Sequence, residues 1–239
     1  MKTIKIGLLG MGNIGTGTYK TLEMNRPEIE STVDAKVEIV KILERDTERD
    51  RGIAVPKEKF TSDPDEIFKD PEIDIVIELL GGIEPATTFM LTAMENGKHV
   101  VTANKAAIAA NYHKLMDTAK ANNVAFRFEA SVGGGIPILG TLTGPLRANK
   151  FEEVLGILNG TTNYILTMMT QEGLDYDTAL RDAQAQGFAE ADPTADVEGI
   201  DAANKLTILM ALMFDKYVAP QDIPTTGITQ ITKKKIEEA

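Results

Sequence analysis

The fold is decided near the start of the chain by Ile6-Gly7-Leu8-Leu9-Gly10-Met11-Gly12-Asn13-Ile14-Gly15, an apolar strand pattern that leads into three glycines with GxGxxG spacing. A helical pattern follows, so these glycines stand at a β–α turn. In such a turn Gly10 permits the tight bend, Gly12 lets the backbone approach a pyrophosphate, and Gly15 lets the helix pack closely on the strand. The free N–H groups at the start of the helix favour an anion. The motif predicts dinucleotide binding; the simpler alternative is a glycine-rich turn without a ligand.

A doubly wound parallel sheet of the α/β class is predicted for residues 1–132, because short apolar segments alternate there with helical patterns. The predicted strands are Thr3–Leu9, Lys36–Leu43, Ile73–Leu80, Lys98–Ala103 and Val124–Val132. Helical spacing of apolar residues predicts helices over Pro85–Asn96 and Tyr112–Asn122. This is the pattern of a Rossmann-type nucleotide-binding domain.

The pattern changes at the glycine run Gly133–Gly135, so a second domain of the α+β class is predicted for residues 133–239. Its predicted elements are a helix that ends near Arg147, a strand over Glu153–Leu158, and helices over Thr162–Gln171 and Asp177–Gln186. The last residues have the pattern of a helix that has only begun. We therefore expect this substrate domain to be incomplete at its C-terminal end.

Composition and charge exclude several classes of protein. The chain has 239 residues, with 25 Lys and Arg against 36 Asp and Glu, and a net charge of −11. An acidic chain does not suit duplex nucleic acid or an anionic membrane surface. The absence of cysteine excludes disulfides, thiol nucleophiles and Cys-ligated metals, and two histidines cannot form a three-His site. No apolar run reaches the roughly 18 residues that cross a bilayer. We expect a cytoplasmic protein.

The end of the second predicted strand bears on the choice of cofactor. Glu44 is of the type that accepts hydrogen bonds from a ribose 2′-hydroxyl, which favours NAD, whereas Arg45 is of the type that binds a 2′-phosphate, which favours NADP. The two residues are adjacent, so NAD and NADP both remain open. A charged, solvated turn is the alternative.

Ligands of doubly wound sheets bind at the carboxyl ends of the strands, which gives weight to residues there. One strand ends in Glu78-Leu79-Leu80-Gly81-Gly82, and the next is followed by Lys105. His99 and His113 have no nearby partner in the sequence, and we expect structural roles for both. Glu129, followed by three glycines, is compatible with a hard cation held by carbonyl oxygens. A hinge between domains is the interpretation that the residues alone favour.

A carboxylate and a lysine lie in the most apolar helical segment of the chain, Gly199–Phe214. Asp201 and Lys205 are four residues apart and therefore share a face of that helix. A helix apolar on nearly every side is usually buried, so we expect this pair to line a cleft; a solvated ion pair is the alternative. A lysine ammonium in a partly desolvated cleft can protonate a carbonyl oxygen during its reduction. The acidic residues upstream are Glu190, Asp192, Asp196 and Glu198, of which Asp192 and Glu198 are expected to be solvated.

Four stretches of the chain resemble the homoserine dehydrogenases. The longest runs Ala183-x-x-x-Gly187-Phe188-Ala189-Glu190-Ala191-Asp192-Pro193-x-x-Asp196-Val197-x-Gly199-Ile200-Asp201-x-x-x-Lys205, and the others are Asn159-Gly160-Thr161-Thr162-Asn163-Tyr164-Ile165-Leu166, Thr102-Ala103-Asn104-Lys105 and Glu129 to Ile136. The resemblance extends over the whole chain. It implies reversible NAD(P)-dependent conversion of L-aspartate 4-semialdehyde to L-homoserine, in threonine and methionine biosynthesis.

The resemblance also implies roles for individual residues. Lys205 and Lys105 are the implied catalytic lysines, with Lys205 as the proton donor, and Glu190 and Asp201 are implied to hold the substrate amino group. Together with the glycine motif, the implied cofactor-binding residues are Gly10, Gly12, Asn13, Ile14, Gly15, Arg45, Lys105, Gly187 and Glu190. A sodium ion is implied at Glu129, Val132, Gly134 and Ile136.

Two alternatives to this function remain. One is a truncated NAD(P)-binding module without turnover, and the other is a related Rossmann dehydrogenase of an amino-acid pathway. Members of the family continue beyond the length of this chain. A homodimer is expected for the complete protein, whereas dimerisation and activity of this chain are open.

Overall fold

The computed structural model describes residues 2–238, which fall into two compact units. The N-terminal unit ends at Ile136 and the C-terminal unit begins at Pro137. The division therefore follows the glycine run instead of preceding it at Val132, where the sequence pattern placed it. Each unit is described by itself below.

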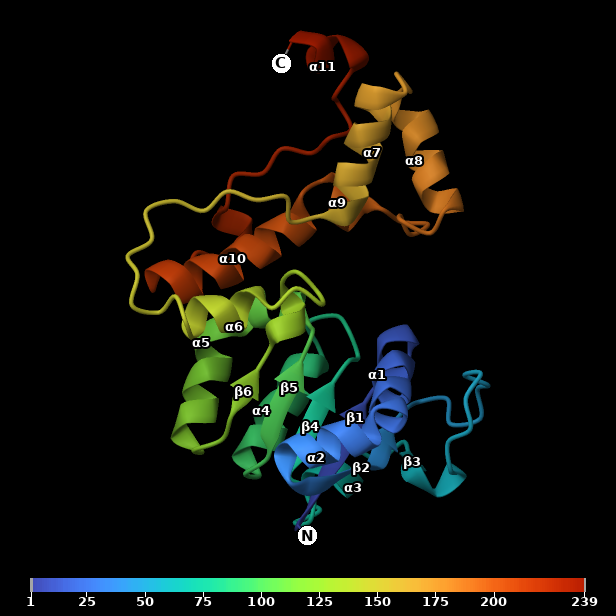
Figure 1. Cartoon of the computed structure of the whole chain (residues 1–239), viewed down its shortest axis with the longest axis vertical. Coiled ribbons are helices and arrows are strands. Elements are labelled where there is room, and N and C mark those ends of the chain that lie inside the picture. The colour runs from blue at the N-terminus through green and yellow to red at the C-terminus, as the bar shows by residue number, and fades with distance from the viewer. Residues whose placement is uncertain (1, 239) are drawn as a thin grey trace. The chain divides into compact units, whose positions relative to one another are not determined.

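The N-terminal unit is built on a six-stranded parallel sheet with the order β3-β2-β1-β4-β5-β6. Its strands are β1 (Lys2–Leu9), β2 (Ala35–Leu43), β3 (Phe60–Thr61), β4 (Ile75–Glu78), β5 (His99–Thr102) and β6 (Phe126–Arg127). Its helices are α1 (Asn13–Met24), α2 (Arg26–Val33), η1 (Lys57–Lys59), α3 (Asp65–Phe68), α4 (Ala86–Glu95), α5 (Lys105–Ala121) and η2 (Glu129–Ser131). The strands lie side by side with helices packed against them (Figure 1). The predicted Rossmann-type α/β fold is confirmed.

The order of the strands places the glycine motif at the centre of the sheet. β1 pairs with β2 on one side and with β4 on the other. Its last four residues are all buried, as expected for a strand covered on both faces. Apolar side chains of α1 and β2, among them Tyr19, Leu22 and Val37, complete the core around Ile6 and Leu8. The glycine turn that follows β1 is therefore held in place by a well-packed core.

The last predicted strand of this unit is much shorter than its sequence pattern suggests. Val124–Val132 was expected to be extended, but β6 contains Phe126 and Arg127 alone, and η2 begins at Glu129. β6 lies at the edge of the sheet and pairs only with β5. An edge strand has one neighbour to hold it, so the chain can leave the sheet early.

The C-terminal unit consists of helices and irregular segments. The helices are α6 (Ile138–Thr143), α7 (Gly160–Gln171), α8 (Tyr176–Ala185), α9 (Thr194–Val197), α10 (Ile200–Phe214), η3 (Pro220–Asp222) and α11 (Lys233–Glu238). α7 and α8 pack together through Ile165, Met169, Ala179 and Ala183. The predicted helix toward Arg147 ends earlier, at Thr143. Among residues 2–238 no helix is both long and apolar enough to span a membrane.

The predicted strand Glu153–Leu158 does not form in the described part of the chain. Leu155 and Ile157 are 83% and 78% exposed, and residues 137–238 contain no strand. A β-strand is stabilised by pairing with a neighbour, and this segment has none among the described residues. The expectation of an α+β unit is therefore wrong for the residues described.

Candidate active site

The glycine turn after β1 has the conformation that its spacing predicts. Gly10 has a φ of +90°, in the region that favours glycine, and its N–H donates to the carbonyl oxygen of Leu43 at 3.0 Å. A Cβ on Gly15 would lie 2.2 Å from the carbonyl oxygen of Gly10, so only glycine allows α1 to approach this closely. A Cβ on Gly12 would meet nothing within 4 Å. The open side of Gly12 is where a ligand can approach the backbone.

The N-terminus of α1 offers donors for an anion. The amide groups of Asn13, Ile14 and Gly15 donate to no oxygen atom of the described residues, and Gly12 has no side chain to cap the helix. The side chain of Ile14 is 63% exposed, so this end of the helix is open to solvent. Free amides combined with the helix dipole suit the phosphates of a dinucleotide.

A cavity of about 550 Å³ opens beside this turn at the carboxyl ends of β1, β2 and β4. It is lined by Gly10, Gly12, Leu43, Glu44, Arg45, Arg49, Ser62, Pro64, Leu79, Leu80, Gly81, Glu84, Pro85 and Phe89. A second cavity of about 400 Å³ lies over the start of α1, where Lys20, Arg49 and Arg51 contribute cations. Apolar side chains and cations line these two cavities together, which suits a nucleoside that carries phosphate.

The two candidates for cofactor choice have different surroundings. One carboxylate oxygen of Glu44 accepts a hydrogen bond from the Met11 amide at 3.0 Å, and the other accepts from the Arg45 amide at 2.9 Å. Glu44 therefore fastens the glycine turn to the end of β2. The Arg45 side chain is exposed and lines the larger cavity.

A third residue of this loop, Arg51, was not singled out from the sequence. Its side chain is only 6% exposed, and its guanidinium lies 5.1 Å from the centre of the Phe60 ring. The guanidinium donates to the backbone carbonyls of Met11, Asp46 and Arg49 and lies 3.5 Å from the Glu44 carboxylate. Arg51 thus joins the loop after β2 to the glycine turn. A lone arginine in a charged run carries no sequence signal for this role.

The ends of β4 and β5 are tied together around a fully buried carboxylate, Glu78. Its oxygens accept hydrogen bonds from the Leu80 amide at 2.7 Å and from the Thr102 hydroxyl at 2.6 Å. The Thr102 hydroxyl oxygen in turn accepts from the amide of Asn104, which caps α5. Lys105 is the first residue of α5, so this network fixes the backbone that carries it.

The histidines have structural contacts, as expected. His99 Nδ1 accepts a hydrogen bond from the Ala125 amide at 2.9 Å. The ring of His113 packs edge-on against Tyr112, with ring centres 5.7 Å apart. Both contacts lie within the N-terminal unit and explain these residues without a ligand.

The segment with the expected sodium residues makes a compact turn at the end of the N-terminal unit. Gly133 and Gly134 both have positive φ, +79° and +57°. Val132 is 1% exposed, and within the described chain the carbonyl oxygens of Val132 and Gly134 accept no hydrogen bond. No cluster of three His, Cys, Asp or Glu suited to a metal occurs in the part of the chain that the structure describes. Any cation here would rely on carbonyls and one carboxylate, that of Glu129.

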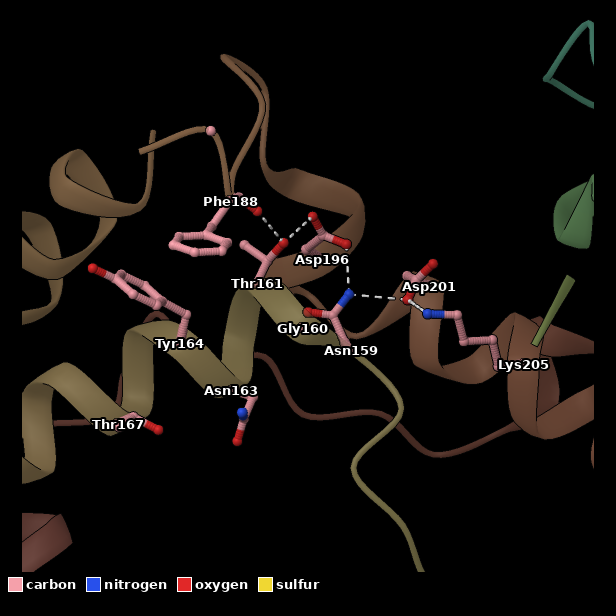
Figure 2. A pocket seen from close by; sticks show the side chains of 11 residues that line it. Asn159, Gly160, Thr161, Asn163, Tyr164, Thr167, Phe188, Asp196, Asp201 and Lys205 are labelled. Atoms are coloured by element: carbon pink, nitrogen blue, oxygen red, sulfur yellow. Dashed lines mark hydrogen bonds and ion pairs between the residues drawn. The ribbon is translucent and has the colours of Figure 1, made fainter. Parts of the chain in front are cut away.

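A separate cavity of about 610 Å³ lies within the C-terminal unit (Figure 2). It is lined by Asn159, Gly160, Thr161, Asn163, Tyr164, Thr167, Gly187, Phe188, Asp196, Asp201 and Lys205. These residues come from the start of α7, the turn after α8, α9 and the first turns of α10. The cavity brings together two motifs that are distant in the sequence.

Asp201 and Lys205 form an ion pair at the wall of this cavity. Lys205 Nζ lies 2.6 Å from Asp201 Oδ2 and donates a second hydrogen bond to the Leu158 carbonyl oxygen, also at 2.6 Å. The two side chains are only 14% and 10% exposed. The alternative of a solvated surface pair is therefore wrong, and the lysine ammonium is held in a fixed direction at the cavity.

A second carboxylate, Asp196, faces the same cavity. Its Oδ1 accepts from the Asn159 amide at 2.6 Å and its Oδ2 accepts from the Thr161 hydroxyl at 3.0 Å. No lysine or arginine pairs with Asp196 among the residues described. The sequence left Asp196 open between a solvated loop residue and a site carboxylate, and only the fold brings it beside Asp201.

The other acidic residues lie away from this cavity. Glu190 is exposed and is not among the lining residues, although Gly187, in the same motif, is. Asp192 is exposed and accepts from the Thr194 hydroxyl and amide, which holds the pKa of its carboxyl below the usual value. Glu198 is also exposed, as expected. Its Oε1 accepts weakly from Thr229 at 3.5 Å.

An aromatic pair forms the far end of the cavity. The rings of Tyr164 and Phe188 stack with centres 4.6 Å apart. The Tyr164 hydroxyl donates to Asp182 at 2.5 Å, and this contact with a carboxylate raises the pKa of Tyr164. Neither ring was identified from the sequence as a site residue. No pattern in the sequence distinguished them.

Two family models match the chain, one for each unit. The model described as homoserine dehydrogenase, NAD binding domain, matches residues 10–129. The model described as homoserine dehydrogenase matches residues 137–239.

Individual relatives agree with this assignment. The homoserine dehydrogenase of Bacillus subtilis is 44% identical over 236 residues, which are 99% of this chain and 54% of that protein. The crystal structure of a Thiobacillus denitrificans homoserine dehydrogenase superposes with a TM-score of 0.94 at 43% identity, covering 99% of this chain and 55% of that one. A hyperthermophilic archaeal homoserine dehydrogenase in complex with NADPH gives a TM-score of 0.82 at 26% identity, over 96% of this chain and 75% of that one. The chain thus spans about half the length of the bacterial relatives, and over that span it belongs to the homoserine dehydrogenase family.

Proposed function

We propose that this chain supplies the cofactor site and the proton donor of an enzyme that interconverts L-aspartate 4-semialdehyde and L-homoserine with NAD(P), in threonine and methionine biosynthesis. The observation that carries the proposal is the shielded Lys205 ammonium at a cavity that also presents Asp196 and Asp201. Family membership supports the same reaction. The alternatives are a cofactor-binding module without turnover and a dehydrogenase for a related substrate.

The glycine turn is proposed to bind the cofactor pyrophosphate. Gly12 leaves its open side to the phosphates, and the amides of Asn13, Ile14 and Gly15 supply donors that no described residue uses. The archaeal relative was solved in complex with NADPH, which supports a nicotinamide dinucleotide as the cofactor. When bound, the nicotinamide exchanges a hydride with the substrate carbon.

Lys205 is proposed to act as the general acid in reduction and the general base in oxidation. During reduction its ammonium donates a proton to the aldehyde oxygen as negative charge develops there, and during oxidation the neutral amine accepts the hydroxyl proton. The hydrogen bonds to Asp201 Oδ2 and the Leu158 carbonyl hold Nζ in place, which removes the rotamer freedom of a long side chain.

The charges of the cavity suit an amino-acid substrate. Asp196 faces the cavity and pairs with no lysine or arginine among the described residues, so its carboxylate favours a cationic group of the substrate. An α-ammonium group meets that need. Roles for Lys105, Glu190 and Gly187 follow from the resemblance and remain predictions; Glu190 does not line the cavity in the C-terminal unit.

The test is homoserine-dependent formation of reduced nicotinamide, followed by absorbance with NAD and NADP separately, alongside a titration of cofactor binding. Turnover with L-homoserine but not with L-2-aminobutyrate, which lacks the hydroxyl, is the expected result. If this chain binds the cofactor without oxidising homoserine and a longer chain does oxidise it, the result favours the cofactor-binding module without turnover. Preference for a different amino-acid-derived alcohol favours the related dehydrogenase.

NADP is the proposed cofactor, because both oxygens of Glu44 are engaged by backbone amides whereas Arg45 and Arg49 line the larger cavity. Arg45→Ala is expected to raise the KM for NADP roughly 10- to 100-fold, the share of a charge-assisted hydrogen bond. The KM for NAD should change little, because NAD has no 2′-phosphate. Steady-state kinetics with both cofactors check this. Arg127→Ala, in β6 and away from the cavity, is the control, and equal losses with both cofactors would contradict the assignment.

A sodium ion is proposed at the turn after η2, held by the Glu129 carboxylate and the carbonyls of Val132, Gly134 and Ile136. The unused carbonyl of the buried Val132 supports it. At ten times its Kd, sodium should add about 1.4 kcal/mol to the free energy of unfolding. Thermal unfolding in sodium chloride against choline chloride at equal ionic strength measures this. Glu129→Gln should remove the difference and Glu95→Gln, in α4, should keep it; identical curves in both salts for the unmodified protein would refute the site.

A homodimer of the complete protein and a cytoplasmic location complete the proposal. The acidic composition, with a net charge of −11, argues against nucleic acid as a partner. Gel filtration with light scattering of the full-length protein tests the assembly.

A further inference from the structure

We propose that Asn159 is a positioning residue that sets the two carboxylates of the cavity and, through Asp201, the ammonium of Lys205. This inference rests on the proposed function and concerns the same cavity. Asn159 is 8% exposed and lies directly before α7. Figure 2 shows its amide between Asp196 and Asp201.

The side chain of Asn159 accepts hydrogen bonds through its oxygen and donates hydrogen bonds through its nitrogen at the same time. Its Oδ1 accepts from the Thr162 amide at 2.8 Å, which caps α7. Its Nδ2 donates to Asp196 Oδ1 at 2.6 Å and to Asp201 Oδ2 at 2.9 Å. Oδ1 therefore caps α7, whereas Nδ2 binds the two carboxylates of the cavity.

The hydrogen bonds from Asn159 Nδ2 reduce the repulsion between the carboxylates of Asp196 and Asp201. Two carboxylates that share one neutral neighbour repel each other, and Lys205 bonds only one of them, Asp201. The Asn159 amide places a donor between the two. Asp201 Oδ2 then receives the amide at 2.9 Å and the ammonium at 2.6 Å, so its orientation is fixed from two sides. The direction of Lys205 Nζ follows from that of Asp201.

Helix capping alone does not require asparagine at this position. Ser and Asp cap helices about as well as Asn does, because each offers a side-chain oxygen. Only Asn adds an N–H pair that can reach two carboxylates while the cap is kept. Substitutions that keep the cap and remove the donor therefore separate the two roles.

Asn159→Ser and Asn159→Asp are the informative variants. Both are expected to fold and to bind NADPH, because the glycine turn proposed to hold the pyrophosphate lies in the other unit. Asn159→Ser should unfold at nearly the temperature of the unmodified protein, whereas Asn159→Asp should unfold at a lower temperature because it brings a third carboxylate beside Asp196 and Asp201. The kcat for homoserine oxidation should fall roughly 10- to 100-fold, the effect of a catalytic group displaced by about 1 Å. In Asn159→Asp the KM for homoserine should not rise, since a third carboxylate still attracts the ammonium. A purely structural role of Asn159 would not lower kcat while the KM for homoserine stayed unchanged.

Asp175→Ser is the matched control, because Asp175 caps the neighbouring helix α8 and lies outside the cavity. It should leave kcat and KM unchanged. A kcat within twofold of normal in both Asn159 variants would overturn the inference. The proposed function would still hold in that case, because the variants would oxidise homoserine. Loss of folding would be visible as a lower unfolding temperature.

A spectroscopic readout tests the bridge without turnover. The Nδ2 protons of Asn159 are expected to exchange slowly with water, and their NMR signals should shift on Asp196→Asn. Fast exchange in the unmodified protein would overturn the bridge. A protein with slow exchange and no homoserine activity would support the bridge while the proposed function failed.

Discussion

Replacing Lys205 by alanine is expected to lower the kcat for homoserine oxidation by roughly 10²–10⁴-fold, the contribution typical of a positioned acid–base group. The reason is the geometry of the pair: Nζ is held 2.6 Å from both Asp201 Oδ2 and the Leu158 carbonyl oxygen. Alanine removes the proton donor and its ion pair with Asp201. Initial rates at saturating cofactor and homoserine measure the effect.

Two variants sharpen this prediction. Lys205→Arg keeps the positive charge, but a guanidinium is effectively always protonated and does not hand over a proton, so this variant should be slow as well. Lys216→Ala, an exposed lysine just beyond α10, is the control and should behave normally. Near-normal turnover in Lys205→Ala would exclude Lys205 as the proton donor.

The second large effect is expected for Gly15→Ala, which should weaken NADPH binding by about 10²-fold. The new Cβ would lie 2.2 Å from the Gly10 carbonyl oxygen, and a backbone atom there cannot move aside as a flexible side chain would. The start of α1 must therefore shift away from the glycine turn, and a displacement of about 1 Å in a binding group has consequences of that size. Overpacking should also lower stability by about 1–3 kcal/mol.

Gly17→Ala provides the comparison within the same helix. A Cβ on Gly17 would meet nothing within 4 Å, and alanine is the better helix former by roughly 1 kcal/mol. Gly17→Ala should therefore raise stability where Gly15→Ala lowers it. Fluorescence titration with NADPH and chemical denaturation of both variants check this. Equal behaviour of the two would show that the contact with Gly10 does not limit the approach of α1.

The N-terminal unit could be predicted from the sequence because its signals are local. A GxGxxG turn after an apolar strand has few alternatives, and strands buried on both faces leave continuous apolar runs such as Ile6–Leu9. Asp201 and Lys205 were also within reach of the sequence, since their spacing on a helix is fixed and the helix has little polar surface.

The remaining features depend on contacts between distant segments. The apolar pattern of Glu153–Leu158 is that of a strand, but a strand needs a neighbour, and the described residues provide none. Asp196 is one of several acidic residues in a loop, and only the approach of Asn159, 37 positions earlier, distinguishes it. Arg51 is likewise separated by 40 positions from the Met11 carbonyl that it binds. Such pairings leave no periodic signal in the chain.

The buried guanidinium of Arg51 has a consequence for redesign of coenzyme use. Arg51 joins the loop that holds Arg45 and Arg49 to the glycine turn, because it donates to the Met11 carbonyl in the turn and to the Asp46 and Arg49 carbonyls in the loop. Such backbone contacts do not depend on which side chains the loop carries. The exposed positions of this loop can therefore be exchanged as a cassette between natural or designed sequences while Arg51 and Phe60 are kept. Libraries that randomise Arg51 together with its neighbours would lose the anchor, and most of their members would fail for that reason and not for their choice of coenzyme.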